Sequence, residues 1–269
     1  MMQKVIYQDL GRIAYSEAWA YQSDLQKQLI DAKRLAQKVE VETTLVASIH
    51  SNDNAPLAVT ETMTPSVKTG IDVAEMPFEQ KHYLLFCEHN PVYTLGKSGS
   101  TTHLLLDEEG LMTKGVEFFK INRGGDITYH GPGQITGYPI FDLDFFFTDV
   151  HKYVRYLEEA VIRTIADYGL TGIRINGYTG VWLEGDNAQP KRKICAIGVH
   201  LSRWVTLHGF AFNVNTDLNF FKNIIPCGIE DEDKTVTSLA VELGRKMDVE
   251  EVKEKLKGHF ATLFEFEFI

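Results

Sequence analysis

Cysteine is scarce in this chain, with three residues among 269. An odd number of cysteines without C-x-x-C spacing argues against a disulfide framework and is typical of a reducing compartment, where a free thiol persists. Long apolar runs are also missing: the start, Met1 to Val5, has no signal-peptide character, and no stretch approaches the ~18 apolar residues of a membrane span. These absences predict a cytoplasmic protein that does not enter a membrane.

Positive charge is in short supply as well. The 27 Lys and Arg residues are outnumbered by 37 Asp and Glu residues, which gives a formal net charge of −10. A general nucleic-acid binder draws on clustered basic side chains, so this class is excluded, whereas protein partners are not. With 44% hydrophobic residues the chain can bury a substantial core, in one large α/β domain or two small ones.

The hydrophobic pattern predicts alternating strands and helices. A strand is expected over Val5 to Gly11, ending at the glycine, and a helix from Arg12 to about Lys38. A second helix is predicted from Asp149 to about Tyr168, and a last one from Asp248 with Val252, Leu256 and Phe260 buried. Further strands are expected at 83–87, 116–121, 134–141, 180–183, 194–200 and 209–214.

Residues 39–79 differ in texture from the rest of the chain. Thr, Ser, Asn, Pro and Ala dominate there, hydrophobic residues are isolated, and the periodicity is weak. Such a composition favours a flexible insertion or long surface loop over a separate domain.

A glycine-rich segment stands out among the expected strands. It runs from Arg123 through Gly124 and Gly125 to His130, and Gly131-Pro132-Gly133 follows it. Glycines let the backbone approach a ligand closely, although a plain hairpin uses them equally well. Taken alone, Arg123 could pair with an acid on a neighbouring strand, and His130 could be a satisfied polar residue at a strand end. The spacing is not that of a P-loop or a dinucleotide-binding motif.

Cysteine and lysine could supply a nucleophile. Cys227 lies between Pro226 and Gly228, in a segment without strand or helix periodicity, whereas Cys87 sits in an apolar strand and reads as a buried hydrophobe. Cys195 is on a predicted strand and its direction stays open. Lys193 ends a basic run that alone would be a solvated loop, yet it also begins an apolar strand, where desolvation would let it lower a thiol's pKa. Acyl transfer through a thioester is therefore the first hypothesis.

Several segments in the same order resemble the lipoyl(octanoyl) transferases, the LipB family, over nearly the whole chain. The matching segments are Asp9-Leu10-Gly11 with Tyr15, Glu88 to Lys97, Arg123 to Gln134, Lys193 to Gly198, His208 to Val214, and Ile225 to Ile229. The insertion at 39–79 departs from the family, which passes more directly from the first helix to the strand at Tyr83.

The resemblance implies an α/β (α+β) fold of mixed sheets packed with helices, shared with biotin and lipoate ligases, in a single catalytic domain over 1–269. It implies that Cys227 carries an octanoyl thioester and that Lys193 lowers its pKa. The acyl chain would lie against Arg123, Gly124, Gly125, Asp126, Ile127, Thr128, Tyr129, His130, Ala196, Ile197, Gly198, Gly209, Phe210 and Ala211. No cofactor or metal is implied.

The implied donor is octanoyl-acyl carrier protein, and the implied acceptors are lipoyl domains of 2-oxoacid dehydrogenases and the glycine cleavage H protein. Because carrier proteins are acidic and so is this chain, we expect a local basic patch that includes Lys191 and Arg192. Two rivals remain: an ATP-dependent lipoate or biotin ligase, which would not require Cys227, and a non-catalytic scaffold that binds acylated carriers.

Overall fold

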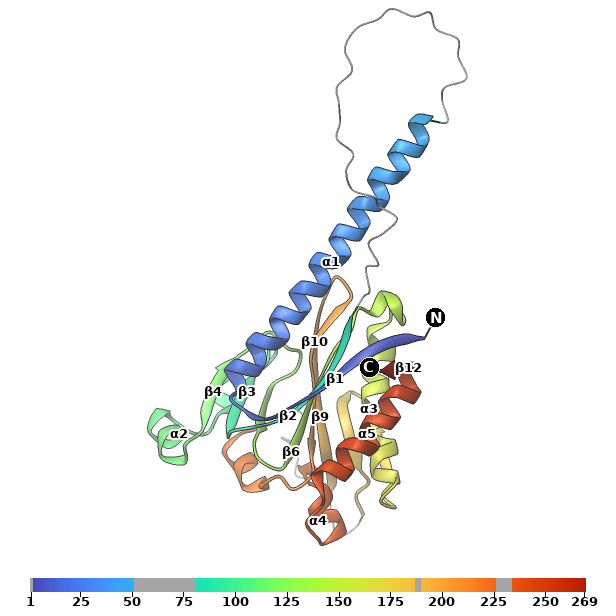
Figure 1. The fold of residues 1–269 in the computed structure, drawn as a ribbon. Helices are drawn as coiled ribbons and strands as arrows, with labels where there is room; N and C mark the ends of the chain where they lie inside the picture. Colours follow the sequence, from blue (N-terminus) through green and yellow to red (C-terminus); the bar gives the residue numbers. More distant parts are fainter. Residues whose placement is uncertain (1, 51–80, 187–189, 226–233) are drawn as a thin grey trace, which may run out of the picture. The chain divides into compact units, whose positions relative to one another are not determined.

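The computed structural model describes residues 2–50, 81–186, 190–225 and 234–269 (Figure 1). The chain divides into two compact units, residues 1–26 with 81–269, and residues 27–80. Helix α1 (Tyr15–His50) runs through both units. Within the second unit, the helix carries ion pairs from Lys27 and Arg34 to Asp31. The site described below belongs entirely to the first unit.

A large mixed sheet forms the framework of the first unit. Its strands run in the order β12 (Phe266–Phe268), β1 (Gln3–Ile13), β2 (His82–His89), β6 (Gln134–Ile140), β10 (Val205–Asn213), β9 (Lys191–Ser202), β8 (Tyr178–Leu183) and β7 (Gly172–Ile175), and β11 (Lys234–Val236) also pairs with β9. β1 is parallel to both of its neighbours and β11 is parallel to β9, whereas the other pairs are antiparallel. The mixed α/β fold predicted from the sequence is confirmed.

A second, smaller sheet holds the strands around the glycine-rich segment. β3 (Val92–Leu95) is parallel to β4 (Glu117–Lys120) and antiparallel to β5 (Ile127–His130). Short helices flank these strands: η2 (Thr101–His103), α2 (Glu108–Lys114), and η4 (Leu218–Asn223). Tyr93, Ile127, Tyr129 and Phe221 form the core of this sheet.

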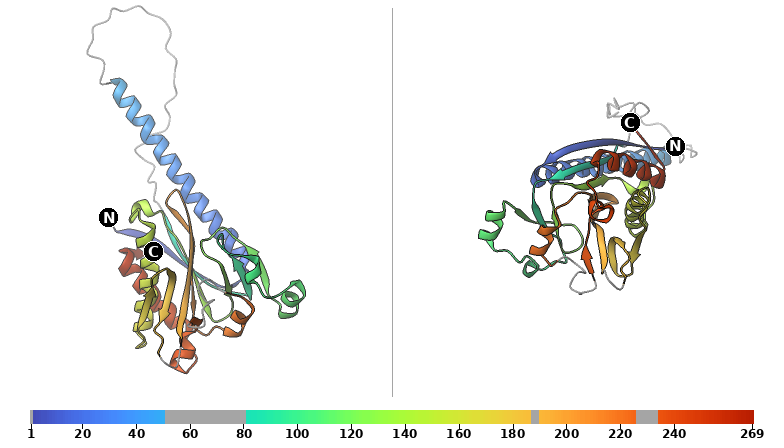
Figure 2. Two further views of the ribbon diagram at one scale, coloured as in Figure 1. Left: turned by 180° about the vertical axis from the view of Figure 1, so that it is seen from behind. Right: turned by 90° about the horizontal axis from the view of Figure 1, so that it is seen from below.

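Helices α3 (Val150–Ala166) and α5 (Val249–Phe264) pack side by side in the first unit (Figure 2). Each begins at a capping aspartate: Asp149 accepts a hydrogen bond from the backbone of Lys152, and Asp248 accepts from Glu250 and Glu251. Both helices were expected from the sequence, because three- and four-residue apolar spacing followed a capping residue. The shorter elements η3 (Leu143–Phe145) and α4 (Leu239–Leu243) precede them in the chain.

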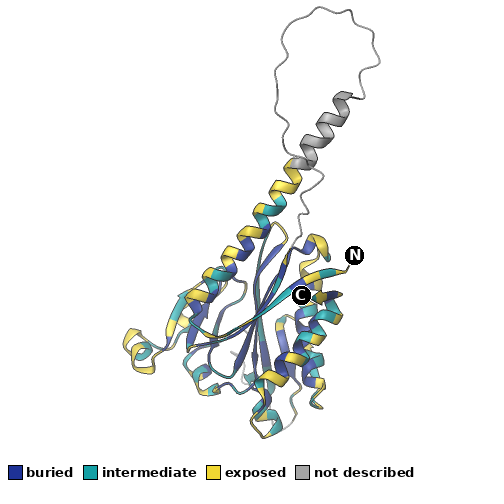
Figure 3. Ribbon diagram, viewed as in Figure 1, coloured by how far each residue is buried: buried dark blue, intermediate teal, exposed yellow. Residues whose placement is uncertain are grey.

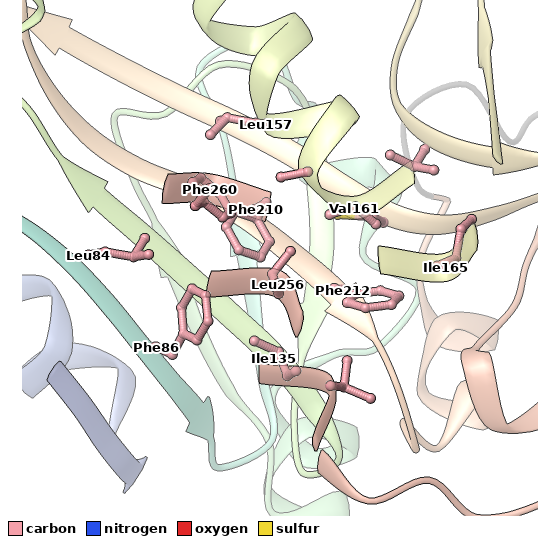
Figure 4. Packing of buried hydrophobic residues seen from close by; sticks show 14 of the residues in the cluster. Leu84, Phe86, Ile135, Leu157, Val161, Ile165, Phe210, Phe212, Leu256 and Phe260 are labelled. Carbon is pink, nitrogen blue, oxygen red and sulfur yellow. The ribbon is translucent and has the colours of Figure 1, made fainter. Parts of the chain in front are cut away.

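The main core lies between the large sheet and these two helices (Figure 4). Phe210 and Phe212 of β10 enter it, together with Val252, Leu256 and Phe260 of α5, which the sequence predicted to be buried. Side chains alternate along a strand, so Ala211, between the two phenylalanines, faces the other side of the sheet. Burial is concentrated along the strands and the inner helix faces (Figure 3).

Boundaries near the start of the chain differ from the expectation. β1 does not end at Gly11 but continues to Ile13, because the glycine, with φ of 59°, lies where the pairing with β2 shifts between Asp9 and Arg12. A glycine at a bulge and one at a strand end look alike in sequence. Helix α1 begins at Tyr15 and runs to His50, so residues 39–50 of the expected insertion are helical, and residues 51–79 lie outside the described residues.

Candidate functional site

A cavity of about 290 Å³ lies against strands β5, β6, β9 and β10, beside the glycine-rich turn. Its walls include Lys193 and all but one of the described residues expected to bind an acyl chain: Arg123, Gly124, Gly125, Asp126, Ile127, Thr128, His130, Ala196, Ile197, Gly198, Gly209, Phe210 and Ala211. The exception is Tyr129, whose ring stacks on Phe220 at 4.6 Å inside the core of the small sheet. Cys227 lies outside the described residues.

The glycine turn joins the two sheets. The Gly124 amide donates to the carbonyl of Val199 on β9 at 2.9 Å, while the Lys97 amide donates to the Arg123 carbonyl at 3.0 Å. A Cβ on Gly198 would lie 2.8 Å from the Gly124 oxygen, and one on Gly96 would lie 2.2 Å from the Gly125 oxygen. The turn is therefore not a plain hairpin: it is held between two glycines, one at the end of β3 and one on β9.

Small residues form the floor of the cavity. In the antiparallel register of β9 and β10, Ala196 lies opposite Ala211, and Gly198 lies opposite Gly209. Thr136 of β6 lies on the other side of Ala211. The two glycines are required by close packing, because a Cβ on Gly198 would lie 2.8 Å from the Gly124 oxygen and one on Gly209 would lie 2.2 Å from the Gly137 oxygen. The floor therefore carries little side-chain bulk across three strands.

Lys193 belongs to β9 rather than to a solvated loop, and its side chain turns toward the cavity. Its Nζ atom lies 4.5 Å from the centroid of the Trp182 ring. Its backbone oxygen accepts a hydrogen bond of 2.9 Å from the amide of Thr237, just beyond β11. The Lys193 side chain, which the sequence could have placed in solvent or in the protein, thus points toward the cavity.

Arg123 reaches from the turn into the small sheet. Its Nη2 atom donates to both the carbonyl and the hydroxyl oxygen of Thr94, at 2.6 and 3.0 Å, and its Nη1 atom donates to the Gly124 carbonyl at 3.0 Å. The guanidinium is buried at 7% exposure. These hydrogen bonds from Arg123 to neutral backbone and hydroxyl oxygens tie the turn to β3.

His130 continues this set of hydrogen bonds into the large sheet. The two protons on Gln134 Nε2 go to the carbonyl of Tyr129 and to Asn213 Oδ1, so Gln134 Oε1 accepts the proton on His130 Nδ1, at 2.9 Å. His130 Nε2 then accepts from the Thr94 hydroxyl at 3.3 Å. Both ring nitrogens are satisfied, as the sequence allowed, and His130 also lines the cavity.

A second hydrogen-bonded group stands beside it. His89 Nδ1 donates to the carbonyl of Ile13 at 3.0 Å, which leaves Nε2 to accept from the Tyr138 hydroxyl at 2.6 Å. Tyr138 and Tyr15 both line the cavity, and the Tyr15 ring stacks on His130 with centroids 5.9 Å apart. Hydrogen bonds therefore fix both histidines and Tyr138 in this wall of the cavity.

Burial keeps the histidines of this region neutral. It lowers the pKa of His89 to about 4 and that of His208 to about 3, and it holds the pKa of His130 well below its ordinary value. For His208 and His130 the nearby Arg123 cation adds to the effect of burial. His208 also adopts a φ of 60°, and its Nε2 atom hydrogen-bonds to Asn122 Oδ1 at 2.8 Å.

The two described cysteines are poor nucleophiles. Cys87 and Cys195 are both fully buried, and burial raises the pKa of each thiol far above its ordinary value. Cys195 lies in the core beneath the helices, which settles the direction that the sequence left open. Cys87 is the buried hydrophobe that the sequence predicted.

Asp126 is oriented by its neighbours. Its Oδ1 atom accepts from the Ile127 amide at 2.7 Å, and its Oδ2 atom is bonded by Nδ1 of His103 from η2. The carboxylate is 8% exposed at the cavity wall. The turn is therefore fixed at both ends, by Arg123 and by Asp126.

Lys191 and Arg192, where a basic patch was expected, both have acidic neighbours. Arg192 makes a bidentate ion pair with Glu242 of α4, at 2.8 and 3.1 Å, and Lys191 lies 3.6 Å from Glu184. Glu242 is 50 residues from Arg192 in the chain, so no local pattern could reveal this neutralisation.

Sequence reasoning missed several cavity residues. Gln134, Thr136 and Tyr138 occupy alternate positions of β6 and line the cavity with Tyr15, Tyr178 and Asn213. Polar side chains at every second position of an otherwise apolar strand were a usable signal, because such positions share one face.

In the described part of the chain, no three His, Cys, Asp or Glu side chains gather closely enough to hold a metal ion. None of the described helices has the length and apolar character that a membrane crossing requires.

Comparison with known proteins finds a matching family and relatives that align over nearly the whole chain. Residues 35–261 match the lipoyl protein ligase A/B catalytic domain family. The chain is 49% identical to an octanoyltransferase of Flavobacterium johnsoniae over 270 residues, covering 100% of both, and 48% identical to one of Cytophaga hutchinsonii over 263 residues, covering 98% of this chain and 93% of the relative.

Two solved structures share the fold. A lipoate-protein ligase A bound with ATP superposes with a TM-score of 0.60 at 14% identity, over 100% of this chain and 88% of the other. A bipartite lipoate protein ligase of Thermoplasma acidophilum gives a TM-score of 0.55 at 19% identity, over 70% of this chain and 73% of the other. At such identities the likeness is one of fold alone, and it confirms the predicted ligase-like architecture.

Proposed function

Because the chain belongs to the octanoyltransferase family, whose members are acyltransferases, we propose that it moves an octanoyl group from octanoyl-acyl carrier protein to a lipoyl-domain lysine through a thioester on Cys227. The observation that carries the proposal is the cavity with Lys193 on its wall and a floor of small residues. The acceptors are lipoyl domains of 2-oxoacid dehydrogenases and the glycine cleavage H protein, and the compartment is the cytoplasm.

The cavity floor suits an unbranched acyl chain. Ala196 and Ala211 offer little side-chain bulk beside the close-packed Gly198 and Gly209, so methylene groups can lie over the strands at the two alanines. Each buried methylene contributes about 0.8 kcal/mol, so an octanoyl chain gains several kcal/mol from burial alone. A branched or aromatic acyl group would collide with the turn that rests on Gly198.

The choice of nucleophile is supported by the state of the other cysteines. Cys87 and Cys195 are buried with strongly raised pKa values, so neither supplies a thiolate near neutral pH. Cys227 remains as the thiol for the thioester, with the Lys193 ammonium as the cation that stabilises its thiolate.

In the proposed reaction Lys193 first donates a proton and later accepts one. The Cys227 thiolate attacks the donor carbonyl, the bond from that carbonyl to the carrier sulfur breaks, and the Lys193 ammonium protonates the departing carrier thiolate. Lys193 is then neutral, so it accepts the proton of the acceptor amine as that amine attacks the octanoyl-Cys227 thioester. The amide forms, the Cys227 thiolate leaves, and the thiolate with its ammonium partner is restored.

Intact mass measurement tests this route. Wild type and Cys227→Ala are incubated with octanoyl-acyl carrier protein without ATP, beside Cys195→Ala as a matched thiol control. We expect an octanoyl adduct on wild type and on Cys195→Ala that hydroxylamine removes, and none on Cys227→Ala. Acylation of a lipoyl domain that appears only when ATP is added would overturn the proposal in favour of an acyl-adenylate ligase.

A further inference from the structure

An aromatic ring lies against the lysine of the proposed mechanism. Trp182 is opposite Lys193 in the pairing of β8 with β9, and Lys193 Nζ is 4.5 Å from the centroid of its ring. The indole is fully buried, so the ring face meets the cation with little competition from water. Tryptophan provides the strongest cation–π attraction of the aromatic residues, and desolvation strengthens it.

A bulge aims the two side chains at each other. The register shifts between Val181, which pairs with Cys195, and Trp182, which pairs with Lys193. Gly180 just before it has a φ of 123°, and a Cβ there would lie 2.5 Å from the Cys195 oxygen and 3.7 Å from Lys193 Cε. The strand can therefore approach Lys193 only because this position is glycine.

The bulge is in turn fixed by helix α3. Glu158 is buried on that helix, and its Oε1 atom accepts a hydrogen bond of 3.0 Å from the Gly180 amide. The other oxygen, Oε2, is paired with Arg155 at 2.6 Å and with Arg174 at 2.9 Å. The carboxylate thus orients the strand, and its charge is balanced by two arginines.

The indole N–H does not account for a tryptophan at this position. Trp182 Nε1 is buried and makes no hydrogen bond to any residue that the structure describes. A buried donor without an acceptor is destabilising, and a phenyl ring would fill much of the same space without that cost. The feature of the indole that the structure uses is its π face.

We propose that Trp182 is a positioning residue that holds Lys193 in place and stabilises its ammonium form, so that Cys227 reacts as a thiolate over a wider range of pH. This inference rests on the proposed function. Trp182 does not line the cavity, and it would act on the Cys227 thiolate only through Lys193.

Other charged and titratable groups surround this pair. Tyr178 meets the Trp182 ring edge-on at 6.1 Å, and Lys234 of β11 lies 5.0 Å from the centroid of the Tyr178 ring. Cys195 lies in the core, and its pKa is raised chiefly by burial, with Glu158 adding to the rise and the Lys193 cation opposing it. The Glu158 carboxylate is paired with Arg155 and Arg174, and the indole face acts on Lys193 in addition to these charges.

The test is the pH dependence of single-turnover octanoylation of Cys227. In wild type the rate is limited at low pH by protonation of Cys227 and at high pH by loss of the Lys193 proton. For Trp182→Leu we expect the high-pH limb to move down by about one pH unit and the low-pH limb to move up. Trp182→Phe, with a weaker π face, should give a smaller shift in the same directions.

A matched control removes the aromatic ring that lies against another lysine. Lys152 Nζ lies 4.3 Å from the centroid of the Phe147 ring, outside the cavity, so Phe147→Leu should leave both limbs in place. A purely structural role for Trp182 predicts a lower amplitude with unmoved limbs, and that result would overturn the inference while the adduct itself still supports the proposed function. If Trp182→Leu does not fold, the limbs of Trp182→Phe decide in the same way. Absence of an adduct on wild type would overturn both proposals.

Discussion

Replacing Gly198 by alanine tests the contact on which the cavity depends. The new methyl group would lie 2.8 Å from the Gly124 oxygen and 2.9 Å from Arg123 Cδ, closer than a Cβ atom normally comes to either. The turn must retreat from β9, and the hydrogen bond of 2.9 Å from the Gly124 amide to the Val199 oxygen lengthens or breaks. The neighbouring Gly124 is the matched control, because a Cβ there would meet the Val199 oxygen at 3.5 Å, an ordinary contact.

The two substitutions should differ clearly in stability. Overpacking of this kind costs about 1–3 kcal/mol, and a lost hydrogen bond adds about 1 kcal/mol, so Gly198→Ala should lower the free energy of unfolding by roughly 2–4 kcal/mol. In a unit of this size, each kcal/mol shifts Tm by about 2–4 °C. Gly124→Ala should be neutral or stabilising by up to about 1 kcal/mol, because alanine restricts the unfolded chain.

Urea unfolding followed by circular dichroism measures the free energy of unfolding of each variant, and steady-state kinetics measures KM. Because the displaced turn is a cavity wall, Gly198→Ala should also raise KM for octanoyl-acyl carrier protein. Equal stabilities for the two variants would refute the reasoning, since the argument depends on the different space beside two glycines of one contact.

Three further outcomes follow from buried polar groups. Burial lowers the pKa of His82 to about 4, below its value in the unfolded chain, so the unfolded state binds more protons and stability falls as the pH drops from about 6.5 toward 4; His82→Phe should remove about 2 kcal/mol of the loss in unfolding free energy between about pH 7 and 5, and an unchanged loss would contradict this. Gln134→Leu leaves His130 Nδ1 without its acceptor and should cost roughly 2–4 kcal/mol in urea unfolding; a loss below about 1 kcal/mol would argue against the network. Arg192→Met should leave the apparent affinity for acyl carrier protein at low salt unchanged, because Glu242 already engages the guanidinium; a marked loss would restore the basic patch.

The elements that the sequence predicted best are those with local causes. Helices α3 and α5 follow from apolar spacing and from the capping residues Asp149 and Asp248, which act within a single turn. Strands β4 and β6, before and after the glycine segment, were also found, because their apolar runs are short and bounded by turn residues. The length of α1 was not predicted, since residues 39–50 carry little apolar periodicity and yet are helical.

The site depended on contacts that no local pattern contains. Whether Lys193 faced solvent or the cavity is decided by a register shift between Val181 and Trp182 of another strand. The sequence also could not show that the glycine turn packs on Gly198. The turn and Gly198 are far apart in the chain, and they meet only because the turn bonds to β9 of the large sheet. The family resemblance brought these residues together in advance, but their geometry came from the fold.

The buried polar network has a consequence for any pH experiment on this protein. His89 and His208 have pKa values near 4 and 3, and His130 titrates well below its ordinary range, so all three stay neutral through the pH range in which a thiol and an ammonium change charge. Their hydrogen bonds, and the cavity wall that they hold, are therefore constant across that range. A change in octanoylation rate near or above neutral pH then reports on Lys193 and Cys227 rather than on the wall, which is what allows the limbs of a pH profile to isolate the contribution of Trp182.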